Sequence, residues 1–400
     1  VANAQTKINY DIFNRPSLGQ LQIMPPTPQP FQFKPVDVTN LSPKTNNFIQ
    51  PNPILNSYTP IEQQNRQMLQ QQGMLPGANN AQQAIALAEA ERDLMEADFY
   101  KKEMAWRSMA KNYINAFDEF NKLNPDSFSL SKVIFLVENA YLDNQLQYNK
   151  FKEGITVRAN FVKQLLKREG LSTKNNIALN YGIQKLFSKQ NLYTNPKTKQ
   201  SYLVPPLKYD FEDFRGEKDY TKMFVSKAMV TGKGQCHSMP LLYLLIAEQL
   251  GAKAQLSLAP QHSFIQFTDK EGKVMNFETT NGNLVSNTWL TQSGYITSMA
   301  LQSKTYINPL SQKQLYSQIL GDLLLGYLAK MPYDDFAEKI RQKILAIDPN
   351  NITALIVDAN IKTQIAKQKI NEAGKPKEEE LPKYPEAYEA YQAMQAAYDK

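Results

Sequence analysis

Proline is concentrated at the start of the chain, where 11 of its 23 prolines lie in residues 1–76. Proline has no backbone N–H and fixes φ, so a segment this rich in it cannot form helix interiors or central strands. Residues 1–78 are therefore predicted to be an extended strap or linker. Spaced aromatic residues such as Phe13, Phe31 and Phe48 also fit a strap that lies along a surface, either its own or a partner's.

The composition supports a compact fold in the remaining residues. The chain has 400 residues, of which 42% are hydrophobic, and a chain of this length usually divides into two or three units. The net charge of +7 is mild, and no dense block of Lys and Arg predicts a nucleic-acid partner. No stretch reaches the roughly 18 consecutive apolar residues of a spanning helix, so no transmembrane segment is predicted.

Changes in sequence pattern divide the rest of the chain into three further units. Residues 79–310 begin with helical periodicity and continue with alternating strands, which predicts an α+β domain. Residues 311–370 contain helices separated by the stop Asp348-Pro-Asn-Asn, which resembles the second half of a tetratricopeptide repeat. Residues 371–400 are predicted to be a charged connector followed by a short terminal helix.

The only cysteine of the chain, Cys236, directly precedes an apolar run. Pro240 fits the first turn of a helix that Gly251 would end. Cys236 is therefore predicted at a helix N-terminus, where the helix dipole and free N–H groups favour a thiolate and can stabilise an oxyanion. An unpaired cysteine outside the cytosol is also exposed to oxidation, which marks it as a reactive thiol.

A histidine and a carboxylate follow the cysteine on two predicted strands. His262 begins the first strand and Glu278 ends the second. A five-residue turn at 268–272 would place these two residues directly opposite each other, whereas a four-residue turn would put them on opposite faces of the sheet. The first alternative gives a site in which Cys236 attacks a carbonyl, His262 transfers the proton and Glu278 orients the imidazole.

The residues beside the thiol, Gln235 and His237, are candidates for lining the oxyanion site or the substrate. No metal ligands are predicted, because the two histidines are far from paired carboxylates in the sequence. The segment Gly232-Lys-Gly lacks the continuation of a phosphate-binding loop, and no cofactor is predicted. The aromatic and acidic segment 209–220 is predicted to pack on the core or to form one wall of a substrate groove.

Three motifs in a fixed order carry a resemblance to a known family. They are Gly234-Gln-Cys, Pro260-Gln-His-Ser-Phe and Asn276-Phe-Glu-Thr-Thr-Asn-Gly. Together they resemble the transglutaminase-like superfamily over about residues 209–289. The resemblance implies a papain-like core, in which a helix that carries Cys236 packs on a small antiparallel sheet with mostly helical surroundings. It also implies a catalytic trio of Cys236, His262 and Glu278, although the family more often has Asp at the third position.

Two functions follow from the resemblance and from the regions outside it. The first is a thiol hydrolase or acyltransferase that acts on a peptide or amide bond of a protein or peptide substrate. The alternative is a non-catalytic adaptor of the cell envelope that binds a protein partner through residues 5–76 and through the helical tail. The two interpretations differ on whether the chain is an enzyme at all.

The resemblance is strongest to exported transglutaminase-like proteins of Bacteroidetes-type bacteria, which implies a location in the periplasm or cell envelope. Ala2 and Ala4 match the small-residue pattern that precedes a signal-peptidase cleavage site, and Gln5 would then begin the mature protein. An arbitrary boundary of the sequence is the alternative.

Overall fold

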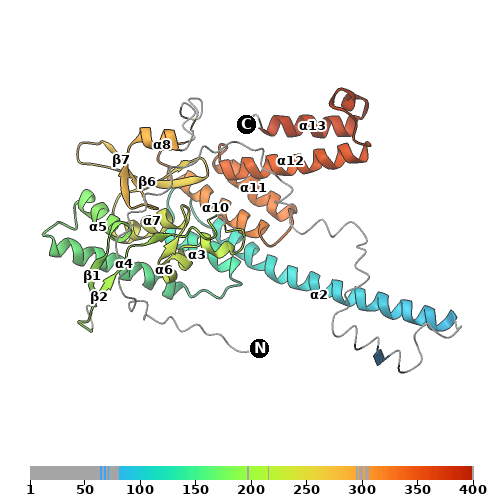
Figure 1. The fold of residues 1–400 in the computed structure, drawn as a ribbon, viewed down its shortest axis with the longest axis horizontal. Helices are drawn as coiled ribbons and strands as arrows, with labels where there is room; N and C mark the ends of the chain where they lie inside the picture. Colours follow the sequence, from blue (N-terminus) through green and yellow to red (C-terminus); the bar gives the residue numbers. More distant parts are fainter. Residues whose placement is uncertain are drawn as a thin grey trace.

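The computed structural model describes residues 81–398, with some internal gaps, and a few residues before them. The exact set is 64, 67, 68, 71 and 81–398 except 196–197, 215, 294–295, 297–300 and 302–305. Almost all of the predicted strap, residues 1–78, lies outside this set. The described part is mostly helical, with small sheets in the middle of the chain (Figure 1). The predicted α+β class is confirmed at this level.

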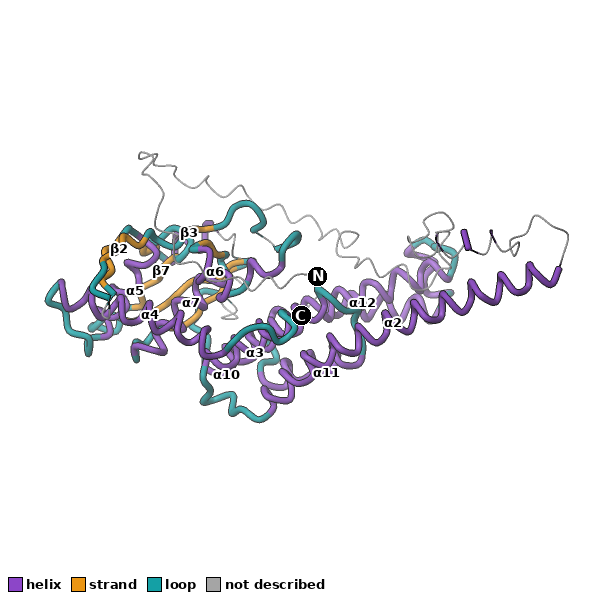
Figure 2. The backbone as a smooth tube through the Cα atoms, turned by 90° about the horizontal axis from the view of Figure 1, so that it is seen from below, coloured by secondary structure: helices purple, strands orange, loops and turns teal. Residues whose placement is uncertain are grey.

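The first four helices of the described part form one side of the fold. They are α2 (Ala81–Asn121), α3 (Leu130–Tyr141), α4 (Tyr148–Arg168) and α5 (Asn176–Ser188). The C-terminal part of α2 packs into the core through Tyr113, Phe117 and Phe120, whereas its N-terminal part extends away from the molecule (Figures 1 and 2). α3 ends at Tyr141 because the residues after it leave helical geometry, and Asp143 and Asn144 have φ of 53° and 60°.

In the described residues, eight strands form three small sheets. They are β1 (Asn191–Thr194), β2 (Ser201–Val204), β3 (Lys208–Tyr209), β4 (Lys233–Gly234), β5 (Gln255–Ala259), β6 (His262–Thr268), β7 (Val274–Glu278) and β8 (Asn283–Val285). The largest sheet is antiparallel, in the order β5-β6-β7-β8, while β3 and β4 form a short parallel pair.

The two edges of the four-stranded sheet differ. The β5 edge is covered by the segment 307–310, since Ile307 N–H donates to the Leu258 carbonyl (2.9 Å) and Leu310 N–H to the Leu256 carbonyl (2.8 Å). At the other edge, β8 is only three residues long. Within the described part of the chain, no further strand pairs with β8.

The helix that follows Cys236 lies at the centre of the fold (Figure 1). It is α7 (Ser238–Leu250), and the other helices of this part of the chain include η3 (Tyr220–Met223), α6 (Val225–Thr231) and α8 (Asn287–Ser293). Almost every residue of α7 is apolar, and α7 is buried between α4 and the sheet. As predicted, Gly251 ends this helix in the left-handed conformation, with φ of 72°.

The C-terminal helices are α10 (Gln312–Leu328), α11 (Asp335–Ile347), α12 (Ile352–Glu372), η4 (Glu378–Lys383) and α13 (Pro385–Tyr398). Of these, α10, α11 and α12 contribute residues to the main core that the N-terminal helices also form. Tyr113 of α2 donates its hydroxyl to the Gly326 carbonyl (2.9 Å), and Tyr316 of α10 donates to the Phe120 carbonyl (2.6 Å). Residues before and after position 310 thus contribute to one apolar core. No helix in the described residues is long and apolar enough to cross a membrane.

Candidate active site

The thiol of Cys236 lies at the start of α7. Met239 N–H donates to the Gln235 carbonyl (3.0 Å), so helical hydrogen bonding begins just before the cysteine and places it in the first turn. The first N–H groups of a helix have no partner within the helix, and they carry a partial positive charge. The Cys236 side chain is partly exposed, and its sulfur lies 3.7 Å from the Gln261 carbonyl oxygen.

A two-residue turn brings the histidine strand to this thiol. β5 and β6 are joined by Pro260 and Gln261, and Gln261 has a φ of 54°. A residue with a side chain pays about 1 kcal/mol or more in this left-handed region. Two contacts hold the strained turn at the start of α7: Gln261 presents its carbonyl to the thiol, and Ser263 donates its hydroxyl to the Cys236 carbonyl (2.6 Å).

The hairpin that joins β6 to β7 has a five-residue turn, but the turn lies one residue later than the sequence predicts. Thr268 pairs with Val274, so the turn is 269–273 rather than 268–272. The prediction that His262 lies directly opposite Glu278 is therefore wrong. Continued by one pair, the observed register places the two residues diagonally on the same face of the sheet.

A diagonal pair is farther apart than a directly opposed one, and the longer side chain of Glu278 spans the difference. His262 Nε2 lies 2.5 Å from one carboxylate oxygen of Glu278. The other carboxylate oxygen accepts the Thr280 N–H (2.8 Å) and hydroxyl (2.7 Å). The extra methylene of Glu relative to Asp is thus accounted for by the register of this hairpin.

The electrostatics of this pair favour its charged form. Burial pushes the pKa of Glu278 upward, but the charge of His262 and the hydrogen bonds from His262 and Thr280 outweigh burial and lower that pKa. Burial likewise lowers the pKa of His262, yet Glu278 and Cys236 together raise it to about 10. His262 is therefore an imidazolium at neutral pH.

The imidazole of His262 interacts with the Glu278 carboxylate and with the Cys236 thiol. A hydrogen bond with Cys236 is among the causes that raise the pKa of His262. The Nε2 atom is the one within hydrogen-bond distance of Glu278. The structure thus brings together all three residues of the predicted trio, Cys236, His262 and Glu278.

The loop that holds Glu278 needs a glycine at position 282. Gly282 has a φ of 74°, and a Cβ atom there would lie 2.6 Å from the carbonyl oxygen of Phe187 at the end of α5. Any other residue would push this loop off α5. Thr280 would then move with the loop and lose its two hydrogen bonds to the Glu278 carboxylate.

The two residues that flank the thiol have partners elsewhere. Gln235 is fully buried, and its amide donates to the carbonyls of Asp210 (2.9 Å) and Asp213 (3.3 Å). His237 points to α10, where its Nε2 lies 3.1 Å from an Asp322 carboxylate oxygen. The side chains of Gln235 and His237 are thus held by groups other than the thiol.

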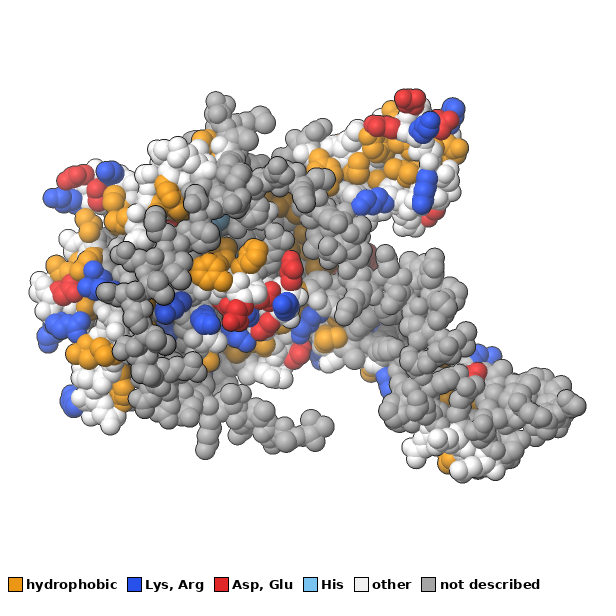
Figure 3. All heavy atoms as spheres, in the orientation of Figure 1, with side chains coloured by type: hydrophobic (Ala, Val, Ile, Leu, Met, Phe, Trp, Pro, Cys, Tyr) orange, Lys and Arg blue, Asp and Glu red, His pale blue; other side chains and the backbone are white. Residues whose placement is uncertain are grey.

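An aromatic pair beside the thiol was only partly visible in the sequence. Tyr209 of β3 pairs with Gly234, and its ring meets Phe211 edge-on at 4.8 Å. Burial raises the pKa of Tyr209, and the nearby negative charges of Cys236 and Glu278 raise it further, so the phenol is neutral. Phe211 is 68% exposed, which supports the groove-wall alternative at this position. Figure 3 shows hydrophobic side chains beside Lys, Arg, Asp and Glu side chains on the face that is in view in Figure 1.

The comparisons with known proteins identify no family. No family model and no curated protein match the chain. Among solved structures, the chain is similar to the crystal structure of menin that reveals the binding site for the Mixed Lineage Leukemia protein. That similarity has a TM-score of 0.33 and 12% identity, and it covers 71% of this chain and 69% of menin. A score this low indicates neither fold nor function. Among the described residues, no three His, Cys, Asp or Glu side chains gather to hold a metal ion.

Proposed function

We propose that this chain is a transglutaminase-like thiol hydrolase or acyltransferase that acts on peptide or amide bonds. The observation that supports the proposal best is the contact of His262 with both Glu278 (2.5 Å) and Cys236. A thiol, an imidazole and a carboxylate in hydrogen-bonding sequence form the arrangement that activates a nucleophile.

The surrounding fold agrees with a papain-like core. α7 starts at the thiol and packs on the antiparallel sheet whose strands β6 and β7 carry His262 and Glu278. This is the arrangement that the resemblance to the transglutaminase-like superfamily implies. A periplasmic or envelope location is part of the same proposal.

The reaction would proceed in two steps. The Cys236 thiolate attacks the carbonyl carbon, and the N–H groups at the start of α7 stabilise the oxyanion that forms. His262 gives its proton to the leaving amine as the C–N bond breaks, which leaves a thioester on Cys236. Water or an amine then attacks the thioester, gives a proton to His262, and releases the acid or the new amide. Glu278 holds the imidazole in place throughout.

A test is to incubate the protein with a library of fluorogenic peptide amides and to follow amine release and the mass of the intact protein. We expect release of the amine that depends on Cys236. In His262→Ala we expect slower release of the amine and an acyl adduct that persists on Cys236. Cys236→Ser serves as the blank. Equal release by wild type and Cys236→Ser would reject the hydrolase proposal.

The adaptor alternative is favoured by a different observation. Ile356 and Ile365 on α12 are 54% and 48% exposed, and α12 and α13 pack mainly against each other (Figure 1). For this alternative, deletion of residues 5–76 should abolish co-purification with envelope proteins. A Cys236→Ala variant should keep the same partners, whereas loss of partners in that variant would contradict a purely non-catalytic role.

A further inference from the structure

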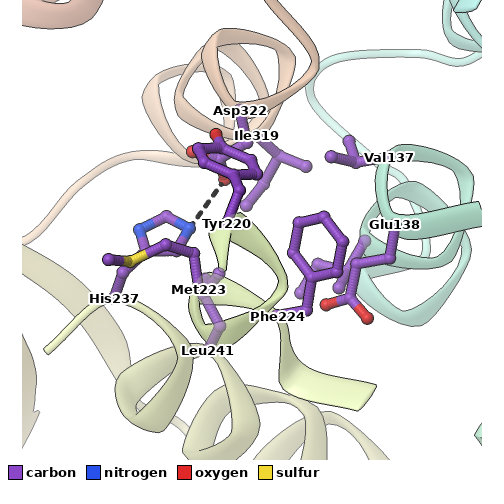
Figure 4. A pocket seen from close by; sticks show the side chains of 10 residues that line it. Val137, Glu138, Tyr220, Met223, Phe224, His237, Leu241, Ile319 and Asp322 are labelled. Carbon is purple, nitrogen blue, oxygen red and sulfur yellow. Dashed lines mark ion pairs between the residues drawn. The ribbon is translucent and has the colours of Figure 1, made fainter. Parts of the chain in front are cut away.

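A second histidine–carboxylate pair lies on the side of Cys236 that faces the helices. His237 and Asp322 approach within 3.1 Å, and their side chains are only 27% and 12% exposed. Figure 4 shows the imidazole of His237 directed at the Asp322 carboxylate, with apolar side chains around both. The small cavity at this point is lined by residues of four elements and of the segment between η3 and α6. The lining apolar residues are Ile134, Val137, Met223, Phe224, Leu241 and Ile319.

The other titratable groups that face His237 are few. Glu138 of α3 accepts the N–H groups of Val225 (2.6 Å) and Ser226 (3.0 Å), which occupies its carboxylate at the start of α6. Tyr220 of η3 is also part of this lining, and burial raises its pKa, so it is neutral. The carboxylate of Asp322 is therefore the direct partner of the imidazole in this cluster.

The pair holds a positive charge next to the thiol. Burial lowers the pKa of His237, but Asp322, and to a smaller extent Cys236 and Glu138, raise it to about 9. His237 is adjacent to Cys236 in the chain, and the negative charge of the thiolate is felt by its ring. The contact with Cys236 is electrostatic, whereas His262 makes a hydrogen bond to the thiol.

The pair also ties the cysteine turn to a rigid part of the molecule. α10, which carries Asp322, is fixed to α2 by the hydroxyl bonds of Tyr113 and Tyr316. On the sheet side, the same turn is held by Ser263. The start of α7 is thus fastened both to the sheet and to the C-terminal helices.

We propose that His237 and Asp322 form a positioning pair that anchors the Cys236 turn to α10 and favours the thiolate through a second imidazolium. The effect on catalysis rests on the proposed function, but the effect on thiol reactivity does not. The reactivity of Cys236 then depends on the packing of α10, which lies outside the segment that resembles the transglutaminase-like superfamily.

The test uses alkylation by iodoacetamide, because Cys236 is the only cysteine and every adduct reports on it. Rates are measured from pH 5 to 10 in wild type and in Asp322→Asn. The matched control is Asp358→Asn, which removes a carboxylate that is 13% exposed and pairs with Arg341 (3.2 Å) far from the thiol in the chain. We expect Asp322→Asn to react about 5–10-fold more slowly at pH 7, and the control to react like wild type.

The pH profile separates this role from a purely structural one. An electrostatic role predicts that wild type and Asp322→Asn converge as the pH rises through about 9, where His237 loses its charge. A ratio that stays constant with pH would overturn the proposal, as would equal rates for Asp322→Asn and the control at pH 7. The double variant His237→Gln/Asp322→Asn leaves no buried charge unpaired, so the same comparison can be made with it if Asp322→Asn does not fold.

A third variant, His262→Ala, keeps this inference distinct from the proposed function. If His262→Ala reacts slowly and Asp322→Asn does not, the positioning role fails and the proposed function stands. If only Asp322→Asn reacts slowly, the proposed function fails and the positioning role stands.

Discussion

Both histidines of this chain are paired with a carboxylate, and both are close to Cys236, but their surroundings differ. His262 belongs to the sheet, lies 2.5 Å from a Glu278 oxygen, and interacts with the thiol closely enough for the thiol to raise its pKa. His237 belongs to the start of α7 and points to α10, where it pairs with Asp322, and its interaction with the thiol is electrostatic. The side chain of each is 27% exposed, and the pKa of each is raised. The exposure and the charge of the two histidines therefore do not distinguish their roles. The groups within hydrogen-bonding distance of each imidazole do.

The largest effect should come from His262→Ala, which removes the hydrogen-bonded partner of the thiol. At pH 6 a free thiol is almost fully protonated, so loss of the thiolate–imidazolium pair should slow alkylation of Cys236 about 100-fold. The rate constant for iodoacetamide at pH 6 measures this directly. A decrease no larger than that in Asp322→Asn would show that the two histidines do not differ as we describe.

The next effect is on stability, from Asp322→Asn. The folded pKa of His237, about 9, exceeds its unfolded value of 6.5, so the pair stabilises the fold fully below pH 6.5 and loses this contribution as the pH rises through 9. With a discount for partial exposure, the cost of the substitution should be about 2 kcal/mol at pH 6 and much less at pH 10. Urea unfolding at both pH values checks it, and a cost that grows with pH would contradict the assignment.

A third prediction concerns Glu278→Asp, the residue more often found in the resembling family. The diagonal register leaves the shorter carboxylate out of direct reach of His262, so we expect alkylation at pH 6 to slow about 10-fold. The pKa of His262, followed by NMR, should fall below its value of about 10 in the same variant. An unchanged alkylation rate together with an unchanged pKa of His262 would indicate that His262 and Glu278 lie directly opposite each other. We thus expect the pair of His262 and Glu278 to be more sensitive to the length of the acidic side chain than the resemblance indicates.

The smallest effect should come from Phe211→Ala, at the exposed aromatic wall. Phe211 is 68% exposed, so the free energy of unfolding should change by less than about 0.5 kcal/mol. Alkylation by a small reagent should not change, because neither histidine is touched. Release from peptide amides with an apolar side chain should show a KM about 3-fold higher. A lower kcat with an unchanged KM would place the effect on the reacting groups and not on the wall.

The parts of the site that depend on local signals were predictable from the sequence. Pro240 and Gly251 mark the ends of the helix after Cys236, because both act through backbone geometry within one turn. The strands of His262 and Glu278 follow from alternation of apolar residues. The shared face was also predicted, because a shift of one residue on each side of the turn preserves the two-residue period of the strands.

The parts that depend on distant contacts were not predictable. Nothing near His237 in the sequence indicates that its ring would meet Asp322, which is 85 positions later on another helix. Tyr209 is placed beside Gly234, two residues before the thiol, by a parallel pairing of only two residues with β4, which is too short to leave a periodic signal. The hairpin between β1 and β2 and the edge strand β8 were also missed, since each strand has four residues or fewer.

The unequal edges of the sheet have a consequence for how copies of this molecule meet. Open strand edges allow neighbouring molecules to exchange strands, which leads to swapped dimers and aggregates. The backbone groups of Leu256 and Leu258 on β5 are already bonded to the segment 307–310, so this edge is closed to a second molecule. Among the described residues, the only edge of this sheet left for such pairing is β8, which offers just three residues.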